Sequence, residues 1–400
     1  MKAPADLMHE NPIEKLSRIH SKPVKTIVGA MSGMSMDGVN LVCAKISGQF
    51  PQLKVESLGS KVVAYSSEFR KRLLAARTCR LAEVAILNRL VGEEFSAHIL
   101  AFLRELQLAP LDIDAIGSHG QTLFHGTTAI NAGGAPGPVT LQVGDPSLIA
   151  ERTGILTVGN FRQRDIAAGG HGAPLVAFAD YVLYRRPGST IAMNNLGSIS
   201  NVTVVPDNFD DVIAFDTGPA NMCIDYFAAA IKENAEGFDK NGTWSVRGSV
   251  VSPFLKALLS IPYLTLPPPK AAGYDEFGPV ALAKMALPFS REKSVDLLRT
   301  AVEFTAQSIA DAYKTLVLMR FPSLREIHFS GGGIYNRTLM ERIRALLPAF
   351  SISTLDSAEA EAKEALAFAI LAHETLCGRP SNVPGATGAT RAVVLGEIAV

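Results

Sequence analysis

Apolar and polar positions along the chain predict strands followed by helices, and this order occurs twice. The first cycle begins with short runs of β-branched and other apolar residues that suit strands, at 26–30, 39–46 and 62–65. Over residues 81–106 the apolar positions then recur mostly every three or four residues, as in a long helix or a pair of helices. A strand cycle followed by helices favours an α/β structure.

The second cycle begins near residue 189 and repeats this order. Three short strands are expected at 190–194, 201–205 and 212–215, and a fourth at 326–330. The helices expected around them are 220–232, 251–259, 294–319, 336–347 and 358–376. Two cycles of one pattern predict two related lobes with a cleft between them, and no short repeat indicates a solenoid.

Charge and cysteine content exclude several classes of protein. The 38 Lys and Arg residues balance the 38 Asp and Glu residues, which argues against non-specific binding of nucleic acid. The four cysteines are far apart and form no CxxC pair, so neither structural zinc nor a disulfide framework is indicated. Neither a membrane-spanning apolar run nor a secretory signal is recognisable, and we expect a soluble, cytoplasmic protein without membrane or nucleic-acid partners.

Three glycine-rich turns follow apolar strands and suggest that the protein binds an anion. They are GAMSGMSMDG at 29–38, FDTGPAN at 215–221 and SGGG at 330–333. Glycine lets a backbone approach a ligand closely, and successive N–H groups can then surround phosphate oxygens. Asp37 and Asp216 could hold Mg²⁺ or act as a base. None of the turns matches GxxxxGK[ST] or GxGxxG, which disfavours a Walker-type NTPase or a Rossmann dehydrogenase.

Two polar clusters could bind a polyhydroxy or anionic substrate. The segment SHGQT at 118–122 places a histidine, an amide and two hydroxyls at the expected end of a strand. Arg162 and Arg164 lie beside the glycine-rich segment 169–172, where guanidinium groups could bind a carboxylate or phosphate. The alternative for Arg164 is a structural ion pair with an acid such as Asp165.

These segments together resemble the anhydro-N-acetylmuramic acid kinase family, which belongs to the actin/hexokinase-like superfamily of two-lobed ATPases with a ribonuclease H-like fold. The matching segments run in order from about residue 29 to 398. They are GAMSGMSMDGVN at 29–40, IGSHGQT at 116–122, the long segment 142–175, NNLGSISNVT at 194–203, FDTGPAN at 215–221, SGGGIYN at 330–336, KEALAFAILA at 363–372 and 386–398. The levoglucosan kinases share this pattern.

The resemblance implies an ATP-dependent kinase in cell-wall sugar recycling. Water attacks the anomeric carbon of a 1,6-anhydro sugar, and the freed O6 takes the γ-phosphoryl of ATP to give N-acetylmuramic acid 6-phosphate. The family's catalytic positions match Asp216, as base, and Glu364. Mg²⁺ would reach the protein through Asp37 or Asp216, bound to ATP.

The other family positions divide into three groups. Those implied for the ATP phosphates are Gly29, Ser32, Gly33, Met34, Ser35, Met36, Asp37, Gly38, Gly197, Thr217 and Gly218. Those implied for the adenosine side are Gly331, Gly332, Gly333 and Asn336. Those implied for the sugar are His119, Gln121, Thr122, Arg162, Arg164, Asp165 and Asn221.

The resemblance also implies the domain organisation and a homodimer. Residues 1–23 are expected to be an extension, 24–187 the first lobe and 188–357 the second, nucleotide-binding lobe, with 358–400 packing back on the first lobe. The chain departs from the family pattern at several site positions, which are Met34, Asn160, Gln163, His171 and Ala220. Two alternatives therefore stay open, a levoglucosan-type or other anhydro-sugar kinase and a sugar- or nucleotide-binding homologue with impaired catalysis.

Overall fold

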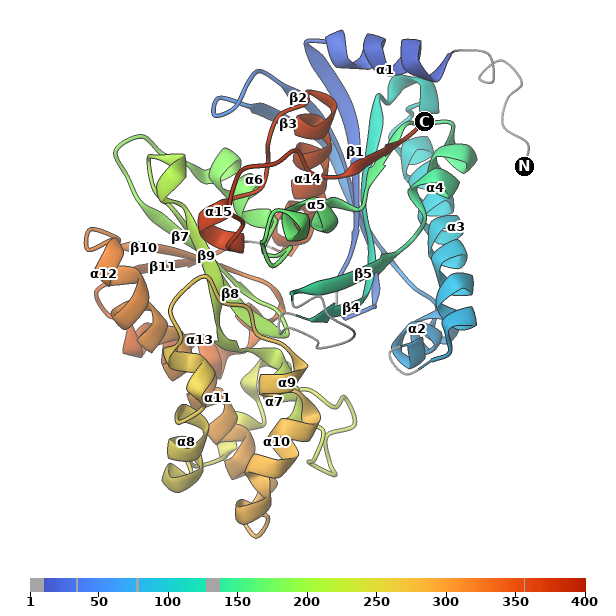
Figure 1. The fold of residues 1–400 in the computed structure, drawn as a ribbon. Coiled ribbons are helices and arrows are strands. Elements are labelled where there is room, and N and C mark those ends of the chain that lie inside the picture. Colours follow the sequence, from blue (N-terminus) through green and yellow to red (C-terminus); the bar gives the residue numbers. More distant parts are fainter. Residues whose placement is uncertain (1–10, 34, 77–78, 127–136, 356) are drawn as a thin grey trace. The chain divides into compact units, whose positions relative to one another are not determined.

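The chain folds into two compact α/β units, which we describe from a computed structural model (Figure 1). The structure describes residues 11–33, 35–76, 79–126, 137–355 and 357–400. Unit 1 combines residues 1–183 with 358–400, and unit 2 comprises residues 184–357. The division falls shortly before the expected boundary at residue 187, and the C-terminal segment belongs to unit 1.

Unit 1 is built on a mixed sheet with the strand order β3-β2-β1-β4-β6-β12, in which β5 also pairs with β4. Strands β1, β2 and β3 form an antiparallel meander, whereas β4 runs parallel to both β1 and β6. The strands are β1 (Val24–Ser32), β2 (Gly38–Ser47), β3 (Lys54–Ala64), β4 (Ala115–Gly126), β5 (Val139–Val143), β6 (Thr157–Gly159) and β12 (Glu397–Ala399).

Unit 2 repeats this topology in a five-stranded sheet with the order β9-β8-β7-β10-β11. Here β7, β8 and β9 form the antiparallel meander, and β10 runs parallel to β7 and β11. The strands are β7 (Ile191–Leu196), β8 (Ile199–Val205), β9 (Ile213–Pro219), β10 (Glu326–Ser330) and β11 (Ser351–Thr354). The shared order confirms the prediction of two related α/β lobes.

The helices of unit 1 bury apolar faces against its sheet. Helix α3, for example, places Leu87, Val91, Phe95 and Ile99 in the core, at the spacing expected from the sequence. The helices are α1 (Pro12–Ser21), α2 (Ser67–Ala75), α3 (Leu81–Glu105), α4 (Pro146–Thr153), α5 (Phe161–Ala167), α6 (Val176–Tyr184), α14 (Ser357–Leu376) and α15 (Pro384–Thr387).

Helix α14 approaches the unit 1 sheet through glycine positions. A Cβ atom on Gly29 of β1 would overlap the carbonyl oxygen of Ala365, and one on Gly117 of β4 would overlap that of Phe368. Only the absence of a side chain at both positions lets the helix backbone lie this close to the strands. Gly29, predicted for the ATP phosphates, therefore has a packing role between β1 and α14.

The core of unit 2 surrounds helix α11, which is buried along much of its length. A π-helical turn over Tyr313–Val317 follows it, so the expected continuous helix over 294–319 is interrupted. The helices are α7 (Asn221–Ala228), α8 (Ser252–Leu259), α9 (Tyr274–Phe277), α10 (Pro279–Ala286), α11 (Ser294–Ala312), α12 (Leu318–Arg320) and α13 (Arg337–Leu346).

Three local expectations differ from the structure. Residues 12–21, expected within a polar extension, form helix α1, whose N-terminus Asn11 caps by accepting the N–H of Ile13. Strand β3 spans eleven residues, Lys54–Ala64, whereas only 62–65 was expected, because polar residues alternate with the less exposed ones along most of it. The helix expected over 220–232 ends at Ala228. Among the described helices, none is long and apolar enough to cross a membrane.

Candidate active site

The turn between β1 and β2 carries the first predicted phosphate segment. It is closed by a hydrogen bond from the N–H of Met36 to the carbonyl oxygen of Gly33, and Met36 has a left-handed φ of 52°. The side chain of Met36 is buried in the core of unit 1, so it anchors the turn. Ser35 and Asp37 are exposed, whereas Met34 lies outside the described residues.

Gln121 of β4 holds this turn in place from the neighbouring strand. Its amide nitrogen donates to the carbonyl oxygens of Gly33, at 3.0 Å, and Thr122, at 3.2 Å. The Ser32 hydroxyl lies 2.7 Å from the carbonyl oxygen of Gly38 and 2.6 Å from Oε1 of Gln121, so it donates to one of them at a time. Gln121, predicted for the sugar, thus supports the predicted phosphate turn, and Ser32 is buried beneath it.

His119 and Arg162, both predicted for the sugar, are brought together in unit 1. Nε and one terminal nitrogen of Arg162 lie 3.1 Å and 2.9 Å from Nε2 of His119. Nδ1 of His119 donates to the carbonyl oxygen of Gly120, and the ring packs on Phe368. Burial, reinforced by the charge of Arg162, holds the pKa of His119 well below its usual range. His119 is therefore a neutral acceptor that orients Arg162.

Glu364 on α14 lies in the electrostatic field of the same group. Burial raises the pKa of Glu364, the cations Lys363 and Arg162 lower it, and the carboxylates of Asp180 and Asp37 raise it further. Asp37 is exposed, and its carboxylate makes no hydrogen bond or ion pair with another described residue, although its carbonyl oxygen accepts the N–H of Tyr65. Unit 1 thus places the predicted acid Glu364 and the turn carboxylate Asp37 close enough to interact.

Asp165 is a structural organiser of the glycine-rich segment that follows α5. Its carboxylate accepts hydrogen bonds from the N–H of Gly172, Nδ2 of Asn382 and the hydroxyl of Thr387, all between 2.8 Å and 2.9 Å. The side chain is fully buried. The structure therefore shows no ion pair between Asp165 and Arg164, the alternative considered from the sequence.

Arg164 and Thr122, both predicted for the sugar, differ in exposure and in hydrogen bonding. Arg164 is exposed and makes no side-chain hydrogen bond or ion pair with a described residue. Thr122 is buried, and its hydroxyl accepts from Nε2 of Gln142 at 3.2 Å. The guanidinium group of Arg164 thus has no described acceptor. The guanidinium group of Arg162, in contrast, makes two contacts with Nε2 of His119 and donates to the carbonyl oxygen of Gly172.

Asp216 lies in β9 of unit 2, at the position predicted for the base. Its Oδ2 accepts the N–H of Ala272 at 2.7 Å, and no described residue donates to Oδ1. Burial raises the pKa of Asp216 to about 7, opposed by the Ala272 hydrogen bond and the Lys270 charge and supported by Glu276. A carboxylate with such a pKa is suited to general-base chemistry near neutrality.

The segment around Lys270 encloses Asp216, and the sequence analysis did not assign it a functional role. The N–H of Asp216 donates to the carbonyl oxygen of Lys270, and the Tyr263 hydroxyl donates to that of Asp216. Nζ of Lys270 donates to the carbonyl oxygens of Tyr263 and Leu264 and lies over the Tyr263 ring. Burial lowers the pKa of Lys270 to about 8, although Asp216 opposes this. The sequence LPPPK at 266–270 was the signal available for this segment.

The remaining predicted phosphate positions of unit 2 surround the β7–β8 and β9–α7 turns. The N–H of Asn221 donates to the carbonyl oxygen of Gly197, which joins the two turns. The Thr217 hydroxyl is buried and lies 2.7 Å from the Ser200 hydroxyl, so it is engaged within the sheet. A Cβ atom on Gly218 would come within 3.0 Å of Ser308 on α11. Backbone groups, rather than these side chains, are what the turns can offer to an anion.

A cavity of about 400 Å³ in unit 2 gathers the residues predicted for adenosine. Gly332 and Asn336 line it, and so does Asn221, which the sequence analysis grouped with the sugar residues. Gly331 has a left-handed φ of 85° and packs against Asn195 and Leu196, and Gly333 also packs on Leu196. The remaining lining residues are Ile224, Asp225, Phe238, Asp239, Lys240, Asn241 and Tyr335.

Two carboxylates in this cavity were missed by the sequence analysis. Asp239 is buried and accepts the N–H groups of Trp244 and Ser245 and Nδ2 of Asn336, so it is part of the wall. The carboxylate of Asp225 makes no hydrogen bond or ion pair with a described residue, and burial together with Asp239 raises its pKa to about 6. Asp225 lies one helical turn after Asn221 on α7, a spacing that puts both on one face.

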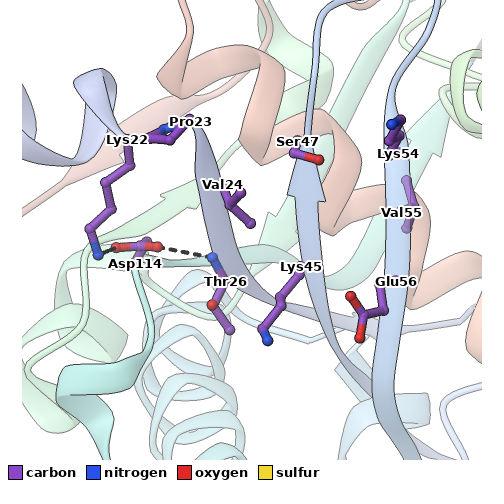
Figure 2. A pocket seen from close by; sticks show the side chains of 10 residues that line it. All are labelled: Lys22, Pro23, Val24, Thr26, Lys45, Ser47, Lys54, Val55, Glu56 and Asp114. Atoms are coloured by element: carbon purple, nitrogen blue, oxygen red, sulfur yellow. Dashed lines mark hydrogen bonds and ion pairs between the residues drawn. The ribbon is translucent and has the colours of Figure 1, made fainter.

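A second cavity, of about 720 Å³, lies on the unit 1 sheet away from every predicted site residue (Figure 2). The buried carboxylate of Asp114 forms one side, where it accepts from Nζ of Lys22 and the N–H of Thr26. Lys45, Lys54 and Glu56 are exposed on the paired strands β2 and β3. This open face holds none of the chemistry predicted from the sequence.

Two α/β units with one strand order, each with a tight turn between its first two strands, define an actin/hexokinase-like protein. Comparison with protein families agrees, because the anhydro-N-acetylmuramic acid kinase model matches residues 25–400. The chain belongs to the anhydro-N-acetylmuramic acid kinase family.

Similar proteins match over nearly their whole length. An anhydro-N-acetylmuramic acid kinase from Caldanaerobacter subterraneus subsp. tengcongensis is 41% identical over 97% of this chain and 100% of its own. One from Bacillus cereus is 38% identical over 93% of this chain and 98% of its own. Among solved structures, the activator of the 2-hydroxyisocaproyl-CoA dehydratase from Clostridium difficile with bound ADPNP gives a TM-score of 0.41 at 12% identity, covering 87% of this chain and 96% of that one.

Proposed function

We propose that this protein is an ATP-dependent kinase that opens the 1,6-anhydro ring of anhydro-N-acetylmuramic acid and phosphorylates O6. Water adds to the anomeric carbon, the bond from that carbon to O6 breaks, and O6 takes the γ-phosphoryl while ADP leaves. The proton that water loses goes to a base, and the product is N-acetylmuramic acid 6-phosphate. Family membership over residues 25–400 supports this reaction.

The observation that carries the proposal is the state of Asp216. Its Oδ2 is fixed by the N–H of Ala272 and its Oδ1 is free of described donors, so Oδ1 can accept a proton from water. A pKa of about 7 keeps a useful fraction ionised near neutral pH and still makes the carboxylate basic enough to take that proton. Asp216 is therefore the proposed general base.

Unit 1 supplies the groups proposed for the sugar. Arg162, oriented by His119, and the unpaired Arg164 are the cations available to the lactyl carboxylate, the group that levoglucosan lacks. Glu364, in the field of Arg162, is the proposed second acid at the sugar. Thr122 and Gln121 would act mainly by supporting this wall, since their polar groups already have partners in the fold.

The hairpin turns supply the groups proposed for ATP and Mg²⁺. Among the described residues, no three histidine, cysteine or acidic side chains form a metal site of their own. This fits Mg²⁺, which is usually held by one or two carboxylates together with phosphates and water. Asp37, exposed at the β1–β2 turn, is the better candidate, because Asp216 is the proposed base and has only one oxygen without a described donor. Mg²⁺ would neutralise charge on the phosphates.

The cavity of unit 2 is the proposed nucleoside site, and Asp225 provides its test. An ionised carboxylate can accept both ribose hydroxyls, whereas the amide of Asp225→Asn offers a single acceptor oxygen. We expect Asp225→Asn to raise KM for ATP about tenfold with little change in kcat, measured by steady-state kinetics at pH 7.5. Asp210→Asn, an exposed acid elsewhere in unit 2, is the matched control. An unchanged KM for ATP would remove Asp225 from the site.

The direct test is phosphoryl transfer to a small panel of sugars. We expect ADP to be released much faster with anhydro-N-acetylmuramic acid than with levoglucosan. A coupled assay would monitor ADP release, and NMR would give the stereochemistry of the product. Faster turnover of levoglucosan would identify the other anhydro-sugar kinase, and ATP binding without turnover would identify an impaired homologue. We also propose a homodimer located in the cytoplasm, on family resemblance alone.

A further inference from the structure

A cysteine, a histidine and a glutamate form a connected group at the C-terminal end of α14, outside the proposed active site. Cys377 follows the helix directly, and its Sγ lies 4.0 Å from Nε2 of His373, one helical turn earlier. Nδ1 of His373 donates to Oε1 of Glu374 at 2.8 Å. Activated nucleophiles in proteins have the same arrangement, in which a base lies beside the nucleophile and a third group orients the base.

The orienting part of the group is held firmly. Glu374 is fully buried and accepts Nε and a terminal nitrogen of Arg379, both at 2.9 Å. His373 is also buried, at 1% exposure, whereas Cys377 is partly exposed. The base therefore has one orientation, and the sulfur remains within reach of a small solute.

Lys25 adds a buried positive charge to the surroundings of the sulfur. Its side chain is 2% exposed, and Nζ donates to the carbonyl oxygens of His20 and Lys22. No carboxylate of the described chain pairs with it, which is unusual for a buried ammonium group. Lys25 lies on the face of β1 opposite Val24 and Thr26, which line the cavity in Figure 2, and so on the face that α14 covers.

The charged and titratable groups around the sulfur come from four segments. They are His373 and Glu374 on α14, Arg379 after it, Lys25 on β1, and His20 on α1, whose Nδ1 donates to the carbonyl oxygen of Leu376. Burial alone would raise the pKa of Cys377, but His373, Lys25 and Arg379 outweigh it and lower that pKa. Burial lowers the pKa of His373, but Cys377 and Glu374 outweigh it and raise that pKa.

The other cysteines lack this environment. Burial raises the pKa of Cys43 to about 11 and that of Cys223 to about 12, and both side chains are buried. Cys79 is partly exposed, like Cys377, and has no histidine or cation bonded to it among the described residues. The other three cysteines therefore serve as internal controls for the reactivity of Cys377: Cys43 and Cys223 are buried thiols, and Cys79 is a partly exposed one.

We propose that Cys377 is a nucleophilic cysteine that hydroperoxides oxidise reversibly, with His373 handling its proton. The thiolate sulfur attacks one oxygen of hydrogen peroxide, an S–O bond forms and the O–O bond breaks. Sulfur loses two electrons and the peroxide gains them. The leaving hydroxide takes the imidazolium proton of His373 and departs as water, which leaves a sulfenic acid on Cys377. Two molecules of a low-molecular-weight thiol return the cysteine and yield water and their disulfide.

The test compares modification rates of the four cysteines in the full-length protein. We expect iodoacetamide at pH 7 to alkylate Cys377 at least about tenfold faster than Cys79, with rates read by peptide mass spectrometry. Under a limiting amount of hydrogen peroxide, a dimedone probe should label Cys377 before any other cysteine. Equal alkylation of Cys377 and Cys79, or peroxide labelling of Cys79 first, would overturn the proposal without the need for a variant.

His373→Asn separates activation of the sulfur from simple access to it. The variant should alkylate Cys377 about tenfold more slowly at pH 7 and at the wild-type rate at pH 10, where the thiol ionises without help. Arg379→Gln, which loosens Glu374, should give a smaller loss in the same direction. A wild-type rate at pH 7 in His373→Asn would show that the histidine has no such role. A slower rate at both pH values would assign it to structure alone.

Discussion

Asp216→Asn should lower kcat by about 10² to 10⁴, the range that a positioned general base contributes. Asparagine has the same shape, and its Oδ1 can still accept the N–H of Ala272, so the Lys270 segment should keep its place. What the variant loses is the ability to take a proton. The measurement is steady-state kcat with ATP and the anhydro sugar, together with the unfolding temperature to show that the fold is retained.

The pH profile of the wild type belongs to the same prediction. Asp216 works as a base only when it is deprotonated, so kcat/KM should fall as the pH drops below about 7, the value to which burial raises its pKa. Asp216→Asn should lose this acid limb. Asp210→Asn, the exposed control, should keep both the rate and the limb. A near-normal kcat in Asp216→Asn would mean that another group is the base.

Gly29→Ala should destabilise the protein by about 3 kcal/mol or more, because the new methyl group would overlap the carbonyl oxygen of Ala365. Both partners are backbone, of β1 and of α14, so neither can move aside as a flexible side chain would. A loss of this size corresponds to a fall of roughly 6–12 °C in the unfolding temperature of a domain of this size. Differential scanning calorimetry would measure it.

Gly137→Ala is the matched control for this prediction. Among the described residues, no atom beyond the chain neighbours lies within 4 Å of a Cβ built on Gly137, so the unfolding temperature of this variant should stay within about 1 °C of the wild type. If Gly29→Ala were equally neutral, the close approach of α14 to β1 would be wrong. The kinase activity of Gly29→Ala should fall in proportion to the folded fraction. KM for ATP should stay the same, since Gly29 is a packing position.

The sequence predicted the elements that have a recurring apolar pattern, and it missed local features that depend on contacts in the folded chain. The repeated order of strands and helices was enough for two α/β lobes, and α3 begins at the predicted Leu81. Helix α1 was missed because its apolar face is narrow, with Ile19 as its buried residue. The π-helical turn after α11 leaves no mark in the apolar pattern, because Tyr313 and Val317 are buried there at the spacing of an ordinary helix.

Motifs identified the site segments, but not which atoms in them are free. FDTGPAN identified Asp216, which was expected just after the strand at 212–215 and lies within β9. Burial raises its pKa, and groups far away in the sequence oppose this rise (Ala272 and Lys270) or support it (Glu276). The motif predicts Asp165 to bind the sugar, yet its carboxylate accepts three hydrogen bonds from other parts of the protein. Hydrogen-bond partners of this kind come from distant segments, and a linear pattern does not encode them.

Unit 1 is made from two stretches of chain, and the second stretch follows the whole of unit 2 in the sequence. Helix α14, which packs on Gly29 and Gly117, cannot do so while residues 184–357 are being synthesised, because it follows them in the chain. The inserted unit can thus complete its own folding on the nascent polypeptide before its neighbour does. Unit 1 is complete only after α14 and β12 have been synthesised, so we expect it to finish folding after unit 2.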